Sequence, residues 1–183
     1  MTRRLSLTAA VMSALSLLWA AVAVAAPAAR APEPARPVDM ARLYSGRWLE
    51  IARLPMRMTD GCPAGATAYT MRSPLKVAVR DTCEVGQPGG REKAIGGTGT
   101  ILDPGTNAKL RVRYALVVVW EYWILDHDED YSWFISSDPT FDKLWIYTRE
   151  VPDAARRAML VERVRALGYD ASRLEFPAQP PLH

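Results

Sequence analysis

The sequence predicts an all-β domain of eight short strands, followed by one helix near its C-terminal end. Runs rich in β-branched and aromatic residues alternate with clusters of Gly, Pro and Asp at nearly even spacing, which is typical of a β-barrel or a β-sandwich. Leu110, Val112 and Tyr114 alternate with basic residues, as in a strand with one buried face. After Pro152 the apolar residues change to helical spacing.

The strands follow one another with short connections. We expect them at residues 48–54, 67–72, 75–82, 93–102, 109–115, 122–125, 132–135 and 143–149. Gly96, Gly97 and Gly99 predict a bend or a bulge in the fourth strand. The last strand is apolar at four consecutive positions, 144–147, so both of its faces must be covered.

The C-terminal helix is the element expected to cover that strand. Pro152 suits the first helical turn, Asp153 favours the positive end of the helix dipole, and Gly168 marks the C-terminal end. Its apolar positions are Met159, Leu160, Val164 and Leu167. We expect this face to pack on the last strand and on Leu49 and Ile51 of the first.

The N-terminal residues have the features of a cleaved secretory signal. Arg3 and Arg4 precede an apolar run over residues 5–24, and Ala23-Val24-Ala25 provides a small-residue cleavage site. We therefore expect a signal peptide at 1–25, an extended and disordered Ala/Pro-rich spacer at 26–37, and one domain at 38–183. An uncleaved membrane anchor is the alternative.

Charge and motifs exclude several classes of function. The chain after residue 25 carries 21 basic and 20 acidic residues, which are scattered rather than clustered, so no nucleic-acid partner is expected. The sequence has no Gly-x-Ser-x-Gly, no His-Glu-x-x-His and no phosphate-binding loop, so we expect no catalytic residue and no cofactor. The acidic run Asp126–Asp130 lacks the spacing of a calcium loop. We interpret it as a solvated turn.

Three segments resemble the conserved segments of the lipocalins. Gly46-Arg47-Trp48 enters an apolar strand that ends in Ala52-Arg53-Leu54-Pro55. Two strands joined by an acidic turn, 122–135, resemble the second conserved segment, and the strand 143–149 ends in a single Arg. This order resembles the bacterial lipocalins, with apolipoprotein D and the plant temperature-induced lipocalins close by. The resemblance covers residues 38–177.

The resemblance implies an eight-stranded up-and-down antiparallel β-barrel with the helix packed outside. Such a barrel holds one small ligand when its interior side chains leave room, and a fully packed core is the alternative. The expected ligand-lining residues are Tyr69, Met71, Val77, Val79, Leu110, Val112, Tyr114, Trp120, Tyr122 and Ile124. The apolar run 115–120 joins the fifth and sixth strands, either as an exposed lip or as a continuation of both strands through the core.

The resemblance also implies structural roles at the two ends of the barrel. Gly46 lets the chain turn into the first strand, and the Arg149 guanidinium lies across the Trp48 ring in a cation–π contact that closes the floor. Cys62 and Cys83 are the only cysteines, and both reach the open mouth. In an exported protein we expect a disulfide between them, with two free thiols as the alternative.

We therefore expect a carrier or store for a small hydrophobic ligand, with a long-chain fatty acid or a lysophospholipid as its partner. The expected location is the periplasm or cell envelope, with transient membrane-surface contact, and a homodimer stays open. Glu50 points inward by alternation from Trp48, where a carboxylate needs a partner, and we expect a structural one. The alternatives are a lipocalin-fold enzyme, which would need a carboxylate pair that includes Glu50, and a ligand-free envelope interaction module.

Overall fold

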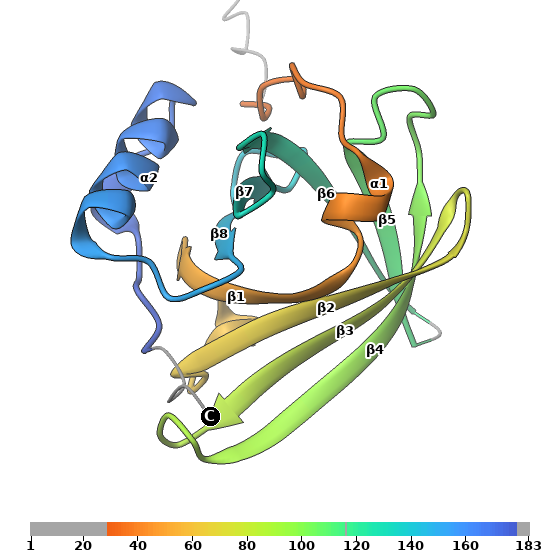
Figure 1. The fold of residues 1–183 in the computed structure, drawn as a ribbon. Helices are drawn as coiled ribbons and strands as arrows, with labels where there is room; N and C mark the ends of the chain where they lie inside the picture. The colour runs from red at the N-terminus through yellow and green to blue at the C-terminus, as the bar shows by residue number, and fades with distance from the viewer. Residues whose placement is uncertain (1–28, 116, 179–183) are drawn as a thin grey trace, which may run out of the picture.

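The computed structural model describes residues 29–115 and 117–178. Eight strands form a closed barrel in sequence order, and every neighbouring pair is antiparallel (Figure 1). They are β1 (Gly46–Arg53), β2 (Ala64–Ser73), β3 (Lys76–Val85), β4 (Arg91–Ile101), β5 (Lys109–Tyr114), β6 (Val118–His127), β7 (Trp133–Ser137) and β8 (Leu144–Thr148). Because β1 pairs with both β2 and β8, no strand edge is left open, and the expected up-and-down barrel is confirmed.

The helices are short except for the one at the C-terminal end. They are α1 (Met40–Leu43), the 3-10 turns η1 (Arg57–Thr59) and η2 (Ala171–Arg173), and α2 (Ala154–Ala166). The side chain of Asp153 caps α2 by accepting from the Arg156 amide at 2.7 Å, and Gly168 follows its end with φ of +89°. No helix within the described residues has the length and apolarity needed to cross a membrane.

Two ends of the barrel differ, and we call them the floor and the mouth. The floor holds α1 and the turns that join β2 to β3, β4 to β5, and β6 to β7. The mouth holds residues 54–63 with η1, and the connections that join β3 to β4, β5 to β6, and β7 to β8.

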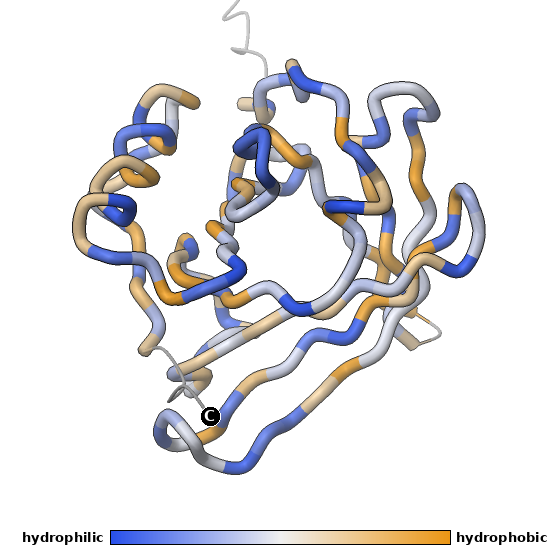
Figure 2. The backbone as a smooth tube through the Cα atoms, in the orientation of Figure 1, coloured by the Kyte–Doolittle hydropathy of each residue, from blue (hydrophilic) through white to orange (hydrophobic). Residues whose placement is uncertain are grey.

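Two apolar cores lie on opposite sides of the barrel wall. One fills the barrel around Trp48, and the other lies between α2 and the outer faces of β1, β7 and β8. Hydrophilic and hydrophobic residues alternate along the strands accordingly (Figure 2). Strand β8 is apolar at its first four positions because Trp145 and Tyr147 belong to the inner core, whereas Leu144 and Ile146 belong to the outer one. The expected packing of the helix is therefore confirmed.

Strand β1 contains one irregularity that changes which residues face inward. Its pairing with β8 shifts register between Glu50 and Ala52, so Ile51 is an extra residue. Both Glu50 and Arg53 consequently face the same side, although three positions separate them, and their side chains meet. Simple alternation from Trp48 would place Arg53 outside.

The glycines of β4 do not mark a bulge. The register of β4 with β3 and with β5 runs without a shift, so of the predicted bend or bulge the bulge is wrong. A Cβ at Gly97 would lie 2.6 Å from Cγ1 of Val112, and one at Gly99 would lie 2.8 Å from Cδ1 of Leu110. These glycines make room for side chains of β5 inside the barrel, a close approach that only a residue without a side chain allows.

The segment that precedes α1 packs along the outside of the barrel. The Ala31 amide donates to the Pro139 carbonyl at 3.2 Å, Glu33 pairs with Lys109 at 2.5 Å, and the Arg30 guanidinium lies 5.0 Å from the Trp123 ring centre. The prediction of a disordered spacer is therefore wrong for its described part, 29–37. The prediction was made from the local composition of the segment, which does not reveal contacts with residues that are distant in the chain.

Candidate ligand-binding cavity

A cavity of about 500 Å³ occupies the mouth half of the barrel. Side chains of β1 to β6 and β8, together with the η1 segment, line it. Its volume lies within the range of about 300 to 1,000 Å³ that is typical of small-molecule sites. The packed-core alternative therefore applies only to the other half of the barrel.

Four of the ten residues expected to line the cavity do so: Tyr69, Tyr114, Trp120 and Tyr122. The other six are absent from its lining and belong to the inner core: Met71, Val77, Val79, Leu110, Val112 and Ile124. All ten face inward, as alternation predicts. Alternation gives the face of a strand but not the depth along the barrel, which is why the six were assigned to the wrong level.

Several cavity residues were missed from the sequence. Asp81 and Ile95 line the cavity and are cross-strand partners on β3 and β4. Trp145 and Tyr147 line it from β8. A usable signal existed for Asp81, because it continues the inward series of Val77 and Val79.

An aromatic wall forms one side of the cavity. The ring centres of Tyr122 and Trp145 are 5.2 Å apart, and Trp120 lies 6.2 Å from Trp145 and 6.3 Å from Tyr122. Such rings present flat faces with a negative electrostatic potential. The wall can therefore contact an apolar chain or a cation.

Polar groups meet inside the cavity around Asp81. The Tyr114 hydroxyl donates to Oδ2 of Asp81 at 2.5 Å, and it lies 3.0 Å from the Tyr122 hydroxyl. Burial raises the pKa of Asp81, and its side-chain interactions with Thr67 and Tyr114 oppose that rise. Burial, with the nearby charge of Asp81, raises the pKa of Tyr114 and of Tyr122 far above the usual tyrosine range. Both phenols thus keep their protons and remain donors.

Glu50 has the structural partner that its inward position requires. Its Oε1 accepts from Nη1 of Arg53 at 2.7 Å, so a buried carboxylate and a buried guanidinium compensate each other. Arg53 also donates to the Cys62 carbonyl at 3.1 Å and to Glu175 at 3.2 Å. Burial raises the pKa of Glu50, and the charge of Arg53 opposes the rise. This network joins β1 to the mouth segment and to the C-terminal segment.

The two cysteines are bonded to each other at the mouth. Cys62 and Cys83 form a disulfide with Cα atoms 5.5 Å apart, which confirms the expected pairing. The bond ties the segment between β1 and β2 to the end of β3.

The connection between β5 and β6 is exposed at the mouth. Strand β5 ends at Tyr114 and β6 begins at Val118. Val117 and Val119 are 86% and 43% exposed, whereas Val118 and Trp120 turn toward the cavity. Of the two interpretations of the run 115–120, its described residues therefore favour the lip.

Contacts at the floor close the opposite end. The Arg149 guanidinium lies 3.5 Å from the Trp48 ring centre, and Trp48 is fully buried. Nη1 of Arg149 donates to the Ser45 carbonyl at 2.8 Å. Gly46 has φ of +62°, and a Cβ there would lie 3.2 Å from Nη1 of Arg149, so this position favours glycine for its conformation and for the close approach. The predicted contact between Arg149 and Trp48 is present.

The acidic turn between β6 and β7 stabilises the backbone. Oδ1 of Asp128 accepts from the Ser132 amide at 2.7 Å, and Asp126 pairs with Arg163 of α2 at 3.4 Å. His127 is buried, and its Nε2 lies 3.1 Å from the Pro37 carbonyl, so the expectation of a solvated turn is wrong at this residue. The described residues contain no cluster of three or more His, Cys, Asp or Glu side chains that could hold a metal ion.

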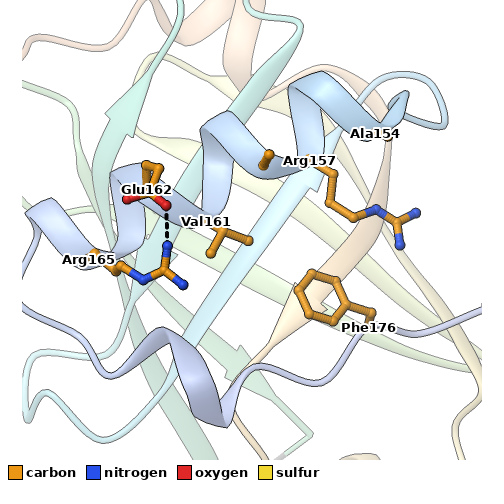
Figure 3. A pocket seen from close by; sticks show the side chains of 7 residues that line it. Ala154, Arg157, Val161, Glu162, Arg165 and Phe176 are labelled. Atoms are coloured by element: carbon orange, nitrogen blue, oxygen red, sulfur yellow. Dashed lines mark hydrogen bonds and ion pairs between the residues drawn. The ribbon is translucent and has the colours of Figure 1, made fainter.

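A second pocket lies on the outer surface, between α2 and the C-terminal segment (Figure 3). Val161 and Phe176 provide its apolar surface, and Arg165 pairs with Glu162 along one side. Arg157 approaches the Phe176 ring to 5.6 Å. This pocket is separate from the barrel interior and has none of the convergent polar groups found around Asp81.

Comparisons with known proteins agree with this architecture. A family model described as a lipocalin-like domain matches residues 38–179. Temperature-induced lipocalin-1 of Arabidopsis thaliana is 32% identical over 148 residues, covering 74% of this chain and 77% of that protein. Outer membrane lipoprotein Blc of Vibrio cholerae is 26% identical over 153 residues, covering 81% and 88%.

Solved structures show the same fold at low identity. Insecticyanin from the tobacco hornworm Manduca sexta has a TM-score of 0.63 at 17% identity, covering 80% of this chain and 83% of that one. Lobster apocrustacyanin A1 has a TM-score of 0.58 at 17% identity, covering 85% and 93%. The closed barrel, its outer helix and the family match over residues 38–179 together establish that this chain belongs to the lipocalin family.

Proposed function

We propose that this lipocalin carries or stores a single-chain lipid, a long-chain fatty acid or a lysophospholipid, in the cavity at its mouth. Lipocalins bind small hydrophobic ligands. The observation that carries the proposal is an open cavity of about 500 Å³ with an aromatic wall. Burying an acyl chain contributes about 0.8 kcal/mol per methylene, so about ten methylenes offset ordinary association costs.

We infer that the protein is exported to the periplasm or cell envelope. The disulfide between Cys62 and Cys83 supports this location, because disulfides persist in oxidising compartments. The similarity to a protein named outer membrane lipoprotein Blc supports it as well. The expected signal peptide, 1–25, lies outside the described residues.

We also infer transient contact between the mouth and a membrane surface. Met58, Ile95 and Val117 are 63%, 47% and 86% exposed around the mouth, and Met58 and Ile95 also line the cavity. Apolar surface that continues from a cavity to its rim is typical of a site that meets a membrane or a partner. A lipid could pass along it without entering water.

The function is tested by extraction of the purified protein and by titration. Lipid released by organic solvent is identified by mass spectrometry, and a fluorescent fatty acid is titrated into the delipidated protein. A carrier yields stoichiometric lipid and saturable binding. Conversion of an added lipid would instead identify an enzyme, and neither binding nor conversion would leave an interaction module.

Two variants of β4 test whether the ligand binds in this cavity. Ile95→Trp fills the cavity from its mouth, whereas Thr98→Trp adds the same side chain on the outer face of the same strand. We expect the first to weaken fatty-acid binding and the second to leave it unchanged. Equal affinities for both variants and the wild type would contradict binding in this cavity.

A further inference from the structure

More negatively charged than positively charged side chains line the cavity. Three carboxylates line it, those of Glu50, Asp60 and Asp81, against a single ammonium group, that of Lys93. Lys93 is exposed near the mouth end of β4. Asp60 is exposed as well, so the carboxylates that lie inside the cavity are those of Glu50 and Asp81.

Asp81 differs from Glu50 in how its charge is compensated. Glu50 has the Arg53 guanidinium at 2.7 Å. Within residues 29–115 and 117–178, no Lys or Arg forms an ion pair with Asp81, whose carboxylate accepts from the neutral Tyr114 hydroxyl. A carboxylate that is removed from water without an opposite charge is costly, so a bound cation would stabilise it.

The surroundings of Asp81 suit an organic cation better than a metal ion. Aromatic rings enclose this part of the cavity, among them Tyr114, Tyr122 and Trp145. Ring faces attract ammonium groups, and aromatic cages are a known means of binding alkylated ammonium. The single carboxylate supplies the ionic partner, and the tyrosine hydroxyls supply acceptor oxygens.

Polarity also changes with depth. Asp81 pairs in register with Thr67 and Ile95 in the middle of β3, whereas Met58 and Val118 surround the opening. An amphiphile that enters head first places its polar end at Asp81 and its chain against the apolar rim. A ligand that enters chain first places its terminal methyl against a carboxylate and hydroxyl groups.

We propose that the cavity selects amphiphiles whose head group is an ammonium ion, bound between the Asp81 carboxylate and the aromatic wall. The proposal rests on the proposed function, because it requires that the cavity hold a single-chain amphiphile at all. It adds the sign of the charge on the head group and the direction in which the ligand enters the cavity. The ammonium can belong to a free alkylamine or to the choline of a lysophospholipid.

Four probes with one chain length separate the contribution of the head group. Dodecylamine, dodecyltrimethylammonium, dodecanol and dodecanoate are titrated into the delipidated protein at neutral pH, each by displacement of a fluorescent probe and by calorimetry. We expect both ammonium probes to bind at least about tenfold more tightly than dodecanoate, as one charge-assisted contact permits. Lauroyl lysophosphatidylcholine, compared with the two ammonium probes, shows whether a lipid head group is also accepted.

Variants assign the effect to one carboxylate. Asp81→Asn keeps the shape and removes the charge, and we expect it to weaken ammonium binding by about tenfold while dodecanol binding stays unchanged. Glu92→Gln is the control. Glu92 is exposed on β4 near the mouth of the barrel, so this variant removes one negative charge outside the site and should leave all affinities unchanged. Tyr114→Phe provides a second test at the same carboxylate if Asp81→Asn fails to fold.

The outcomes are distinguishable. Equal affinity for all four head groups, or tighter binding of dodecanoate, overturns the ammonium site and leaves the proposed function standing. Binding of none of the probes overturns both. Loss of ammonium preference in Glu92→Gln as well as Asp81→Asn would mean that the net charge of the protein, rather than the site, selects the cation.

Discussion

The Arg149 guanidinium joins one short backbone segment to the ring that it covers. Its nitrogens donate to the carbonyls of Arg42, Ser45 and Arg47 at 2.8, 2.8 and 3.0 Å. Trp48 in turn donates from Nε1 to the Leu43 carbonyl at 2.9 Å. One side chain at the end of β8 therefore holds the turn between α1 and β1 in place.

Trp48→Ala should lower the free energy of unfolding by about 3 to 5 kcal/mol, because it removes a fully buried aromatic side chain. Arg149→Ala should cost less, since its outer side stays in contact with water. Chemical denaturation of the single and double variants measures both, and a double-mutant cycle should show coupling between them. Additive losses would mean that the ring and the guanidinium do not stabilise each other.

Asp81 should lower the stability of the empty protein at neutral pH. Burial raises its pKa in the folded state, so the folded protein keeps this proton to higher pH than the unfolded chain. The stabilising contribution is therefore complete below the unfolded pKa of about 3.9 and is lost as the pH rises through the folded pKa.

The Asp81→Asn variant has no carboxylate at this position and therefore does not lose stability as the pH rises through the pKa of Asp81. We expect this variant to have a higher Tm than the wild type at neutral pH, with the difference shrinking toward about pH 3. Thermal unfolding of the delipidated proteins across this range is the measurement, and Glu92→Gln is the control. A difference in Tm that stays constant with pH would mean that Asp81 affects stability through packing rather than through its charge.

At the scale of elements, large side chains of one strand fit inside the barrel where the neighbouring strand carries residues without side chains. Strand β4 does so at Gly97, where a Cβ would lie 2.6 Å from Cγ1 of Val112, and it continues without a register shift. Its neighbour Gly96 faces outward, where an added Cβ would meet nothing closer than 3.9 Å. Two adjacent glycines in one strand therefore have different roles.

Gly97→Ala should destabilise the protein by about 1 to 3 kcal/mol, because the added methyl group overlaps a stiff β-branched side chain. Gly96→Ala should be neutral or stabilise by about 0.4 to 1 kcal/mol through the unfolded chain. Urea denaturation of both variants tests the pair. Equal effects would indicate that β4 bends away from β5 in solution.

The sequence predicted the existence, order and inner faces of the strands, because these follow from local alternation and turn residues. It did not predict the extra residue at Ile51, which places Arg53 beside Glu50, because nothing in the local pattern marks it. It assigned Val77 and Val112 to the cavity although they lie in the packed half. Depth along a barrel depends on pairing between strands that are distant in the chain, as the contact between Asp81 and Tyr114 shows.

At the scale of the whole molecule, the disulfide and the lip both belong to the mouth. The disulfide joins residues 21 positions apart and holds the η1 segment beside β3. The exposed lip residues Val117 and Val119 lie at or beside the connection of β5 to β6.

Reduction of the disulfide should lower the Tm by several degrees. A closed loop of this length contributes about 3 kcal/mol, and each kcal/mol shifts the Tm of a domain of this size by about 2 to 4 °C. Thermal unfolding with and without reductant measures the shift, with Cys62→Ser/Cys83→Ser as the matched variant. An unchanged Tm on reduction, with free thiols confirmed by titration, would mean that other contacts, such as that of Arg53 to Cys62, hold the segment.

Val117→Asp should slow lipid transfer from vesicles while leaving the affinity for a soluble amphiphile unchanged, because Val117 is exposed and does not line the cavity. Val118→Asp should impair both, since Val118 lines the cavity. Transfer between labelled vesicles and titration in solution separate the two effects. Equal transfer rates for Val117→Asp and the wild type would argue against contact between this lip and a membrane.

The sealed floor has a consequence for the path of a ligand. Trp48 and Arg149 close one end of the barrel, so a bound molecule has to leave through the opening by which it entered. Such a protein cannot serve as a conduit that spans a donor and an acceptor at the same time. A carrier of the proposed kind would have to release its donor, diffuse and turn the same face to the acceptor, so that delivery would proceed as a shuttle with one docking event at each end of the journey.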